Sequence, residues 1–316
     1  MTNLEEWEDY GEFISSKGFA FSDCRVLTNF VAQVYLISQD QPAILKEVDT
    51  TSSEYEVATY LRGCTSPQNH TVRFLDILHP EGKKKAILVM PCLSGFLDFP
   101  LKTPQELLDL IMQTLEGLAF MHSHNITHSD ITPANVMIDV DLDDDFNEIS
   151  PRRYCFIDFG LSQKLGGPHS TILNRFGTKH YTAPEVSDQT SYNPFKADVW
   201  ALGQIISEFV EKMENDGTVV PPDIRQLVVA MQKPADKRLT AQAVLEMSRN
   251  LTPDQTISSL HVSPTLTLRV FDVIRRISPF SFLLFVLTTI VILYCVWSDS
   301  QAVHIGFFKT FLGFRS

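Results

Sequence analysis

The chain has 316 residues, of which 44% are hydrophobic and 20% are charged, and this is enough to bury the core of one large domain or of two lobes. The formal net charge of −12 argues against nucleic-acid binding, because affinity for a phosphate backbone requires an excess of lysine and arginine. The five cysteines are scattered without C-x-x-C spacing, which indicates neither a disulfide framework nor a zinc site and is typical of a reducing compartment.

The N-terminal part of the chain predicts a small β-rich lobe over residues 21–91. An acidic extension, residues 1–20, precedes it and lacks the apolar core of a secretory signal. Alternating apolar residues predict strands in RVLTNF, AQVYLIS and PAILKEV, and two further apolar runs, TVRFLDIL and KKAILVMPCL, follow. Between them, TSSEYEVATYLRGC predicts one helix, because four apolar side chains share a face: Val57, Tyr60, Leu61 and Cys64.

Helical patterns dominate the next part, residues 92–248. Thr103 is a predicted N-cap, and Pro104 with the capping-box residue Glu106 begins a long amphipathic helix that ends just before His128. A short strand pair, NVMID and YCFIDFG, precedes three more helical segments, around residues 199–210, 224–231 and 241–247. The sequence therefore predicts an α+β fold with a small β-rich lobe and a larger helical lobe.

The C-terminal part carries the pattern of a membrane anchor. Residues 249–275 are rich in Ser, Thr and Pro and indicate a linker, and residues 298–316 form a short tail. Between them, residues 277–297 contain no charge and would form a helix about 30 Å long, which matches a bilayer core. A buried soluble helix of this length nearly always carries a polar stripe. Two arginines precede the segment and an aspartate follows it, so the positive-inside rule predicts that the preceding domain faces the cytosol.

The residues that indicate chemistry lie in six motifs. These are AILKEV with Lys46, HSDITPANVMID with His128, Asp130 and Asn135, FIDFGLS with Asp158, Phe159 and Gly160, GTKHYTAPEV with Glu185, ADVWALGQII with Asp198, and PADKRLT with Arg238. In this order and spacing they resemble the protein kinase family, whose signature set includes a strand lysine, H-R-D-x-x-x-x-N, D-F-G and A-P-E. The resemblance covers roughly residues 20–250. The sequence around the motifs is also similar to that of kinase-like proteins of basidiomycete fungi.

The resemblance implies a bilobal kinase fold that binds ATP and Mg²⁺ and transfers a phosphoryl group, mainly by positioning and charge neutralisation. Asp130 would orient the acceptor hydroxyl or take its proton. Asp158 and Asn135 would supply oxygen ligands to magnesium, and Lys46 would hold the α- and β-phosphates as a point charge.

Other motif residues would have structural roles in such a fold. Glu185 and Arg238 would form a buried ion pair between the activation segment and the helical lobe, and Asp198 would brace the catalytic loop through backbone N–H groups. His128, Phe159 and Gly160 complete the H-R-D and D-F-G motifs as structural residues.

The nucleotide would bind between the lobes, with Met90 as gatekeeper, the Pro91 carbonyl and the Leu93 N–H facing adenine, and Leu27 and Val34 covering it. Lys46 needs a helix glutamate as its partner, and two are available. At about 100° per residue, Glu54 projects within the face that carries Val57, whereas Glu56 points roughly 160° away. Helical phase therefore favours Glu54.

Three departures from the family pattern leave two functions open. Counting back from Val34, the glycine positions of the phosphate loop are Leu27, Asn29 and Ala32, so the grip on the triphosphate should be weaker. Ser129 replaces the arginine of H-R-D, and Thr132 replaces a lysine, although its hydroxyl can still donate one hydrogen bond. We favour a membrane-anchored kinase acting on Ser or Thr of an unidentified protein. The alternative is a pseudokinase scaffold, and a small-molecule kinase is a third and weaker reading.

Overall fold

The computed structural model describes residue 7 and residues 9–28, 30–36, 41–96, 98–142, 148–173, 177–186 and 190–251. All of them belong to one compact unit, Met1–Thr256, and a second unit comprises Ile257–Ser316. No helix in the described ranges is long and apolar enough to cross a membrane. The predicted span 277–297, the tail and all but the first three residues of the predicted linker lie outside those ranges.

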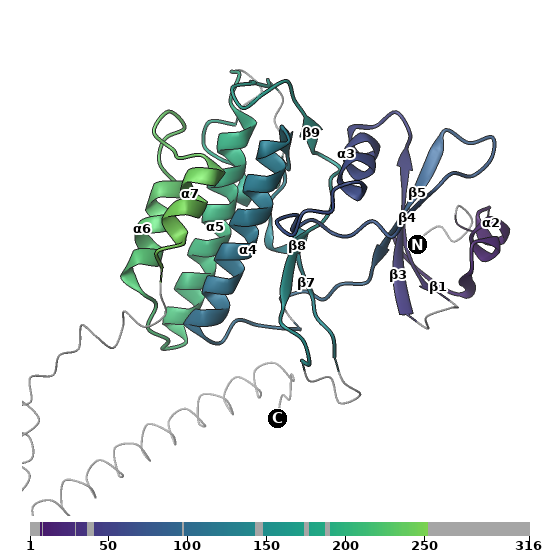
Figure 1. Ribbon diagram of the computed structural model, residues 1–316, viewed down its shortest axis with the longest axis horizontal. Helices are drawn as coiled ribbons and strands as arrows, with labels where there is room; N and C mark the ends of the chain where they lie inside the picture. The colour runs from purple at the N-terminus through teal and green to yellow at the C-terminus, as the bar shows by residue number, and fades with distance from the viewer. Residues whose placement is uncertain are drawn as a thin grey trace, which may run out of the picture. The chain divides into compact units, whose positions relative to one another are not determined.

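The N-terminal lobe is a five-stranded antiparallel sheet with the order β1-β2-β3-β5-β4 (Figure 1). Its strands are β1 Phe19–Thr28, β2 Val31–Leu36, β3 Gln41–Asp49, β4 Asp76–Leu78 and β5 Lys85–Pro91. Helix α3, Ser53–Arg62, follows β3 and begins where the Ser52 side chain accepts a hydrogen bond from the Tyr55 backbone N–H. This N-cap satisfies one of the free donors at the helix start.

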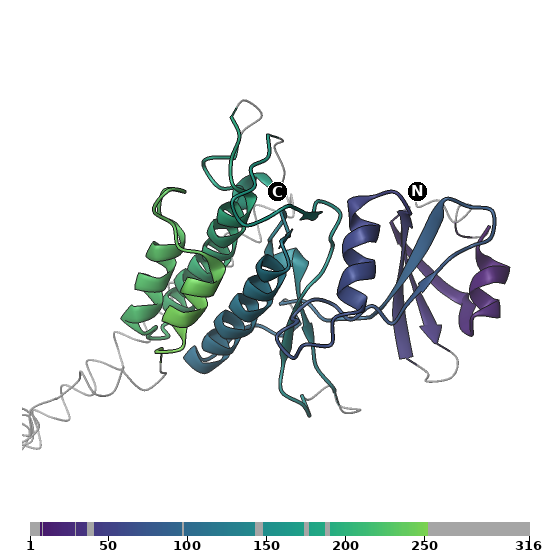
Figure 2. The same ribbon diagram turned by 45° about the horizontal axis from the view of Figure 1, so that its top comes forward.

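A short helix, α2 Gly11–Ser16, covers the face of the sheet opposite α3, as Figures 1 and 2 show. Trp7, Tyr10 and Ile14 pack there with apolar side chains of the strands, and together they form a cluster separate from the main core. Residues 7 and 9–20 are therefore part of the lobe, and β1 begins at Phe19, inside the segment that the sequence predicted to be an extension. The prediction was wrong because this segment is too short and acidic for its apolar residues to indicate long-range packing.

The C-terminal lobe is helical, as predicted. Helices α4 Pro104–Ser123, α5 Pro194–Asn215, α6 Pro222–Met231 and α7 Ala241–Ser248 pack side by side (Figure 2). The expected capping box at the start of α4 is present, with Thr103 and Glu106 as its two members. Four short strands position the loops: β6 Ile126–Thr127 pairs with β9 Gln163–Lys164, and β7 Val136–Asp139 pairs with β8 Arg153–Phe156.

The segment between α3 and β4 joins the two lobes. The Phe156 backbone N–H donates to the His70 carbonyl at 2.9 Å, and the Val72 N–H donates to the Phe156 carbonyl at 2.8 Å. Helix α4 passes close to this segment at Gly117, where a Cβ atom would lie 2.7 Å from the His70 Cβ. A glycine is therefore required for this approach. These contacts hold the segment that follows α3 against β8 and α4.

Candidate active site

A half-buried lysine on β3 connects three elements of the site. Lys46 Nζ lies 2.6 Å from Glu54 Oε1 on α3 and 2.8 Å from Asp158 Oδ1 in the loop after β8. Glu54 is buried and Glu56 is exposed, so the structure pairs the lysine with the glutamate that helical phase favours. Gly160 stands close to all three charges: a Cβ there would lie 3.2 Å from Asp158 Oδ1 and 3.7 Å from Glu54 Oε2.

The protonation of this network follows from burial and charge. Burial by itself lowers the pKa of Lys46, but the carboxylates of Glu54 and Asp158 outweigh it and the net pKa is raised. Burial raises the pKa of the Glu54 carboxyl, and Lys46 opposes that rise. For Asp158, burial is outweighed by the charge of Lys46, which lowers the pKa. The lysine is therefore a permanent cation at neutral pH, ready to hold phosphate oxygens.

A cavity of about 330 Å³ opens beside Lys46 and is mostly apolar. Of the predicted nucleotide contacts, Leu27, Met90, Pro91 and Leu93 line it, together with Lys46 and Glu54. Its size and lining fit a flat heteroaromatic ligand with a few polar contacts. Three residues that the sequence did not predict also line the cavity: Val31, Gln33 and Ile44.

The prediction that Val34 covers the nucleotide was wrong. In the β2–β3 ladder, Val31 pairs with Lys46 and Gln33 pairs with Ile44, whereas Val34 pairs with Ala43. Because side chains alternate across a strand, Val34 lies on the opposite face, fully buried in the cluster beneath α2. The family pattern did not indicate which face of β2 Val34 occupies, and the pairing of β2 with β3 sets that face.

The loop after β6 holds the predicted catalytic aspartate between two neighbours. Asn135, at the end of a 3₁₀ turn over Pro133–Asn135, donates through Nδ2 to the Asp130 carbonyl at 2.9 Å and to Asp130 Oδ2 at 3.2 Å. Asp130 Oδ1 accepts hydrogen bonds from the backbone N–H and the hydroxyl of Thr178, both at 2.9 Å. Thr178 is a site residue that the sequence did not predict, although it is the second residue of the motif GTKHYTAPE.

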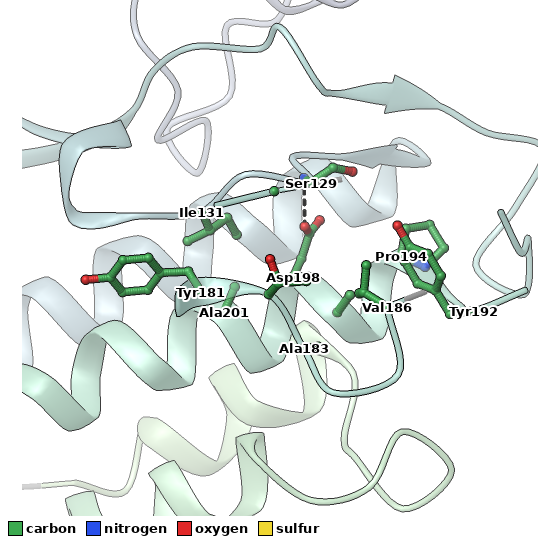
Figure 3. A pocket seen from close by; sticks show the side chains of 12 residues that line it. Ser129, Ile131, Tyr181, Ala183, Val186, Tyr192, Pro194, Asp198 and Ala201 are labelled. Carbon is green, nitrogen blue, oxygen red and sulfur yellow. Dashed lines mark hydrogen bonds between the residues drawn. The ribbon is translucent and has the colours of Figure 1, made fainter. Parts of the chain in front are cut away.

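Asp198 braces this loop from below, as predicted. Its Oδ1 accepts from the Ser129 N–H at 2.8 Å (Figure 3), and its Oδ2 accepts from the His128 N–H at 2.9 Å. Ser129 has φ of +66°, a left-handed conformation that is costly for a residue with a Cβ and that persists only where surrounding contacts enforce it. The small cavity in Figure 3, about 20 Å³, has room for about one water molecule. It is too small to hold a substrate.

His128 and Phe159 form the buried underside of the site. The His128 ring lies 5.4 Å from the Phe159 ring and 5.6 Å from the Phe156 ring. Its Nδ1 accepts from the Asp130 N–H and its Nε2 donates to the Ile157 carbonyl, which together require the neutral tautomer. Burial accordingly lowers the pKa of His128. Asp158 itself has φ of +59°, so both carboxylate-bearing loops contain a strained residue.

The predicted pair between the activation segment and the helical lobe is present. Arg238 contacts both carboxylate oxygens of Glu185, and its guanidinium also donates to the carbonyls of Lys196 and Lys233. The Arg238 side chain is 1% exposed. This bidentate geometry anchors the segment that begins at Gly177 and contains Thr178.

Comparison with known proteins identifies the fold. The family description "Protein kinase domain" matches residues 31–218. The chain belongs to the protein kinase family. It is also similar to the serine/threonine-protein kinase pakF of Dictyostelium discoideum, with 30% identity over 172 residues, which are 53% of this chain and 13% of that protein. The match thus covers only a small part of that relative's length.

The residues of this kinase domain fit a magnesium ion that is bound with its substrate. Within the described ranges, no group of three or more His, Cys, Asp and Glu side chains is placed to hold a metal by itself. Mg²⁺, however, is usually held by one or two carboxylates plus substrate phosphates. The Asp158 side chain is 49% exposed and lines the cavity. The Asn135 backbone carbonyl accepts a hydrogen bond from the N–H of Ile157, the residue that precedes Asp158. The Asn135 amide nitrogen contacts Asp130, which leaves the amide oxygen for a cation.

Thr132 lies at the start of the 3₁₀ turn and is 5% exposed. Its carbonyl accepts from the Asn135 N–H at 3.0 Å. Thr132 stands between Asp130 and Asn135 in the chain, which agrees with the predicted position beside these two residues. Its short, largely buried side chain carries no positive charge.

Proposed function

We propose that this domain transfers the γ-phosphate of ATP to serine or threonine hydroxyls of a protein. The proposal rests on two carboxylates, those of Asp130 and Asp158, which are held by different partners. Asp130 is fixed by Asn135 and Thr178, and Asp158 is tied to Lys46 at the nucleotide cavity. A phosphoryl transfer site needs one carboxylate for the acceptor and another for a cation.

Each residue has a distinct task in this proposal. Bound Mg–ATP would supply the phosphoryl group. Lys46, fixed by Glu54, holds phosphate oxygens, and Asp158 and Asn135 present oxygen atoms to the cation. Asp130 orients the acceptor hydroxyl and takes its proton, and Thr178 keeps the Asp130 carboxylate pointed toward the acceptor. The likeness to a serine/threonine kinase supports an aliphatic rather than a phenolic hydroxyl as acceptor.

The alternative is a pseudokinase that binds partners and transfers nothing. It is favoured by Thr132 and by the β1–β2 hairpin, where no glycine stands between Phe19 and Leu36. Gln33 and the branched Ile44 also line the cavity. These features weaken binding of the triphosphate, whereas the intact set of Lys46, Asp130 and Asp158 favours transfer.

The two functions are separated by a transfer assay with one matched variant. We expect ATP to raise the melting temperature only with Mg²⁺ present, and we expect wild-type protein to transfer γ-phosphate to a generic protein substrate. Asp130→Asn should keep the thermal shift and lower the transfer rate by about 10³-fold, as for loss of a general base with its positioning role. Equal, negligible transfer by both proteins would contradict the kinase proposal and leave the pseudokinase.

We also propose that residues 277–297 anchor the domain to a membrane with the kinase facing the cytosol. The support is the uncharged 21-residue composition of this segment and the arginines before it. Deleting the segment should move the protein from the membrane fraction to the supernatant. Asn69, Asn125 and Asn250 begin N-x-Ser/Thr sequons, and a glycan on Asn69 or Asn250 in cells would contradict the orientation.

A further inference from the structure

A lysine on β9 lies over the ring of a tyrosine on α3. The Lys164 Nζ atom stands 3.8 Å from the centre of the Tyr60 ring, well inside the range of about 6 Å in which a cation is attracted to the face of an aromatic ring. Lys164 is exposed and Tyr60 is half-buried. Figure 1 shows β9 beside α3. The contact therefore joins a helix of the N-terminal lobe to a strand of the C-terminal lobe.

The lysine side of this contact is fixed to the catalytic loop. Lys164 stands opposite Ile126 in the β6–β9 pair, and β6 leads directly into the loop that begins at His128. The Ser162 hydroxyl, just before β9, donates to the His128 carbonyl at 3.1 Å. The backbone of Lys164 is therefore held by the same loop that carries Asp130.

The tyrosine side of the contact also meets the end of α4. The His124 ring lies 5.7 Å from the Tyr60 ring and 4.4 Å from the Phe120 ring. A carbonyl can only accept, so His124 Nδ1 donates to the Phe120 carbonyl, at 2.9 Å, and this bond orients the imidazole. Lys164 acts on the chain just beyond α3 as well: burial raises the pKa of the Cys64 thiol, and the charge of Lys164 opposes that rise. The last turn of α3 thus has neighbours on both α4 and β9.

The position of α3 determines whether Glu54 can meet Lys46. Glu54 and Tyr60 are six residues apart on this helix, a rise of about 9 Å, so a contact that holds Tyr60 also restrains Glu54. Apolar packing has no preferred direction, and α3 contributes three buried apolar side chains to the core: Val57, Ala58 and Leu61. A cation over a ring, in contrast, fixes where that ring stands. Both partners belong to this chain, so the contact requires neither a ligand nor a modified residue.

We propose that Lys164 and Tyr60 are positioning residues, whose contact holds α3 in the place where Glu54 meets Lys46. This inference rests on the proposed kinase function and adds to it a restraint that is built into the fold. Neither Lys164 nor Tyr60 lines the nucleotide cavity, so both act through Glu54. Loss of one exposed cation–π contact corresponds to about a two- to fivefold change in an equilibrium constant, which sets the size of the expected effects.

Single and combined variants test the proposal by transfer to the generic protein substrate. We expect Lys164→Met and Tyr60→Leu each to lower kcat/KM for ATP about two- to fivefold, and the double variant to fall no further than either one. Lys164→Arg keeps the cation and Tyr60→Phe keeps the ring, so each should retain most of the activity. Lys84→Met changes an exposed lysine in the turn before β5 and should match wild type.

A combination with Glu54 separates positioning from general support of the fold. Because Lys164 acts through Glu54, Lys164→Met should cause no further loss of kcat/KM in a Glu54→Gln background. The proposal is overturned, and the kinase function stands, if Lys164→Met keeps wild-type kcat/KM, if its loss is the same in both backgrounds, or if the losses from Lys164→Met and Tyr60→Leu add. Melting curves confirm that each variant is folded.

Hydrogen exchange of α3 gives a readout that does not depend on phosphate transfer. We expect amides of residues 53–62 to exchange about two- to fivefold faster in Lys164→Met and Tyr60→Leu than in wild type or Lys84→Met, because a less restrained helix opens more often. If wild-type protein transfers no phosphate, the kinase proposal fails, and faster exchange in both variants still supports the restraint on α3. Unchanged exchange in both variants overturns that restraint.

Discussion

The two sides of the nucleotide cleft differ in how firmly they are held. On the lower side, the catalytic loop is fixed by Asp198 below it, by Asn135 across it and by Thr178 beside it. On the upper side, the β1–β2 hairpin covers the cavity with Leu27, 41% exposed, and ends in Phe30, 55% exposed. The side chains that would act on the hydroxyl and the cation, Asp130 and Asn135, thus lie in a loop that several hydrogen bonds hold in place. The cover over the cavity is a hairpin without glycine between Phe19 and Leu36, whereas close approach of a backbone to phosphates is easiest where side chains are absent.

The largest effect is expected from removing the brace of the lower side. Asp198→Ala leaves two buried N–H groups, those of His128 and Ser129, without their acceptor, and each unsatisfied group costs about 1–3 kcal/mol. We expect the free energy of unfolding in urea to fall by roughly 3–5 kcal/mol and transfer to be lost. Asp216→Ala, at the exposed end of α5, should change neither. An unchanged free energy of unfolding for Asp198→Ala would show that the loop keeps its conformation without these two hydrogen bonds.

The second-largest effect is expected on the upper side, where α2 packs against the face of the sheet opposite α3. Ile14 is fully buried against the strands, and truncating such a side chain to alanine costs about 2–5 kcal/mol. We expect Ile14→Ala to lower the urea midpoint accordingly, whereas Glu12→Ala, an exposed position on the same helix, should not. An unchanged midpoint for Ile14→Ala would mean that residues 9–20 are dispensable.

A smaller effect tests the ion pair that links the sheet to α3. Glu54→Gln removes the charge that faces Lys46 at 2.6 Å, so we expect kcat/KM for phosphate transfer to fall by about ten- to hundredfold, or about 1.4–2.8 kcal/mol. Glu56→Gln changes the same residue type two positions away, on the exposed face, and should leave kcat/KM within about twofold of wild type. Equal losses in both variants would remove Glu54 from its proposed role.

The smallest effect is a pH dependence that originates on the lower side. The pKa of His128 lies below its ordinary value near 6.5 because the ring is buried, so the folded state favours the neutral form. This stabilisation is complete above about pH 6.5 and is lost as the pH falls through the folded-state pKa, by at most about 1.4 kcal/mol per pH unit. Urea midpoints between pH 7.5 and 5 should show this decline. His169→Gln, an exposed control, should keep the decline, and a flat profile would contradict a neutral His128.

The sequence by itself determined most of the candidate site and the helices that support it. Lys46, Asp130, Asn135 and Asp158 stand in short motifs, and their order along the chain is enough to indicate the family. The choice of Glu54 followed from helical phase, and the start of α4 followed from a capping box, which is also a local signal. Each of these features depends on residues a few positions apart.

Only the tertiary structure decided the features that depend on distant residues. The face of β2 that meets the cavity is set by its pairing with β3, so Gln33 lines the cavity and Val34 does not. The packing of α2 and the contact from Thr178 to Asp130 each join segments tens of residues apart. Such contacts leave no periodic signal in one sequence, because burial of distant surfaces selects them rather than local backbone preference.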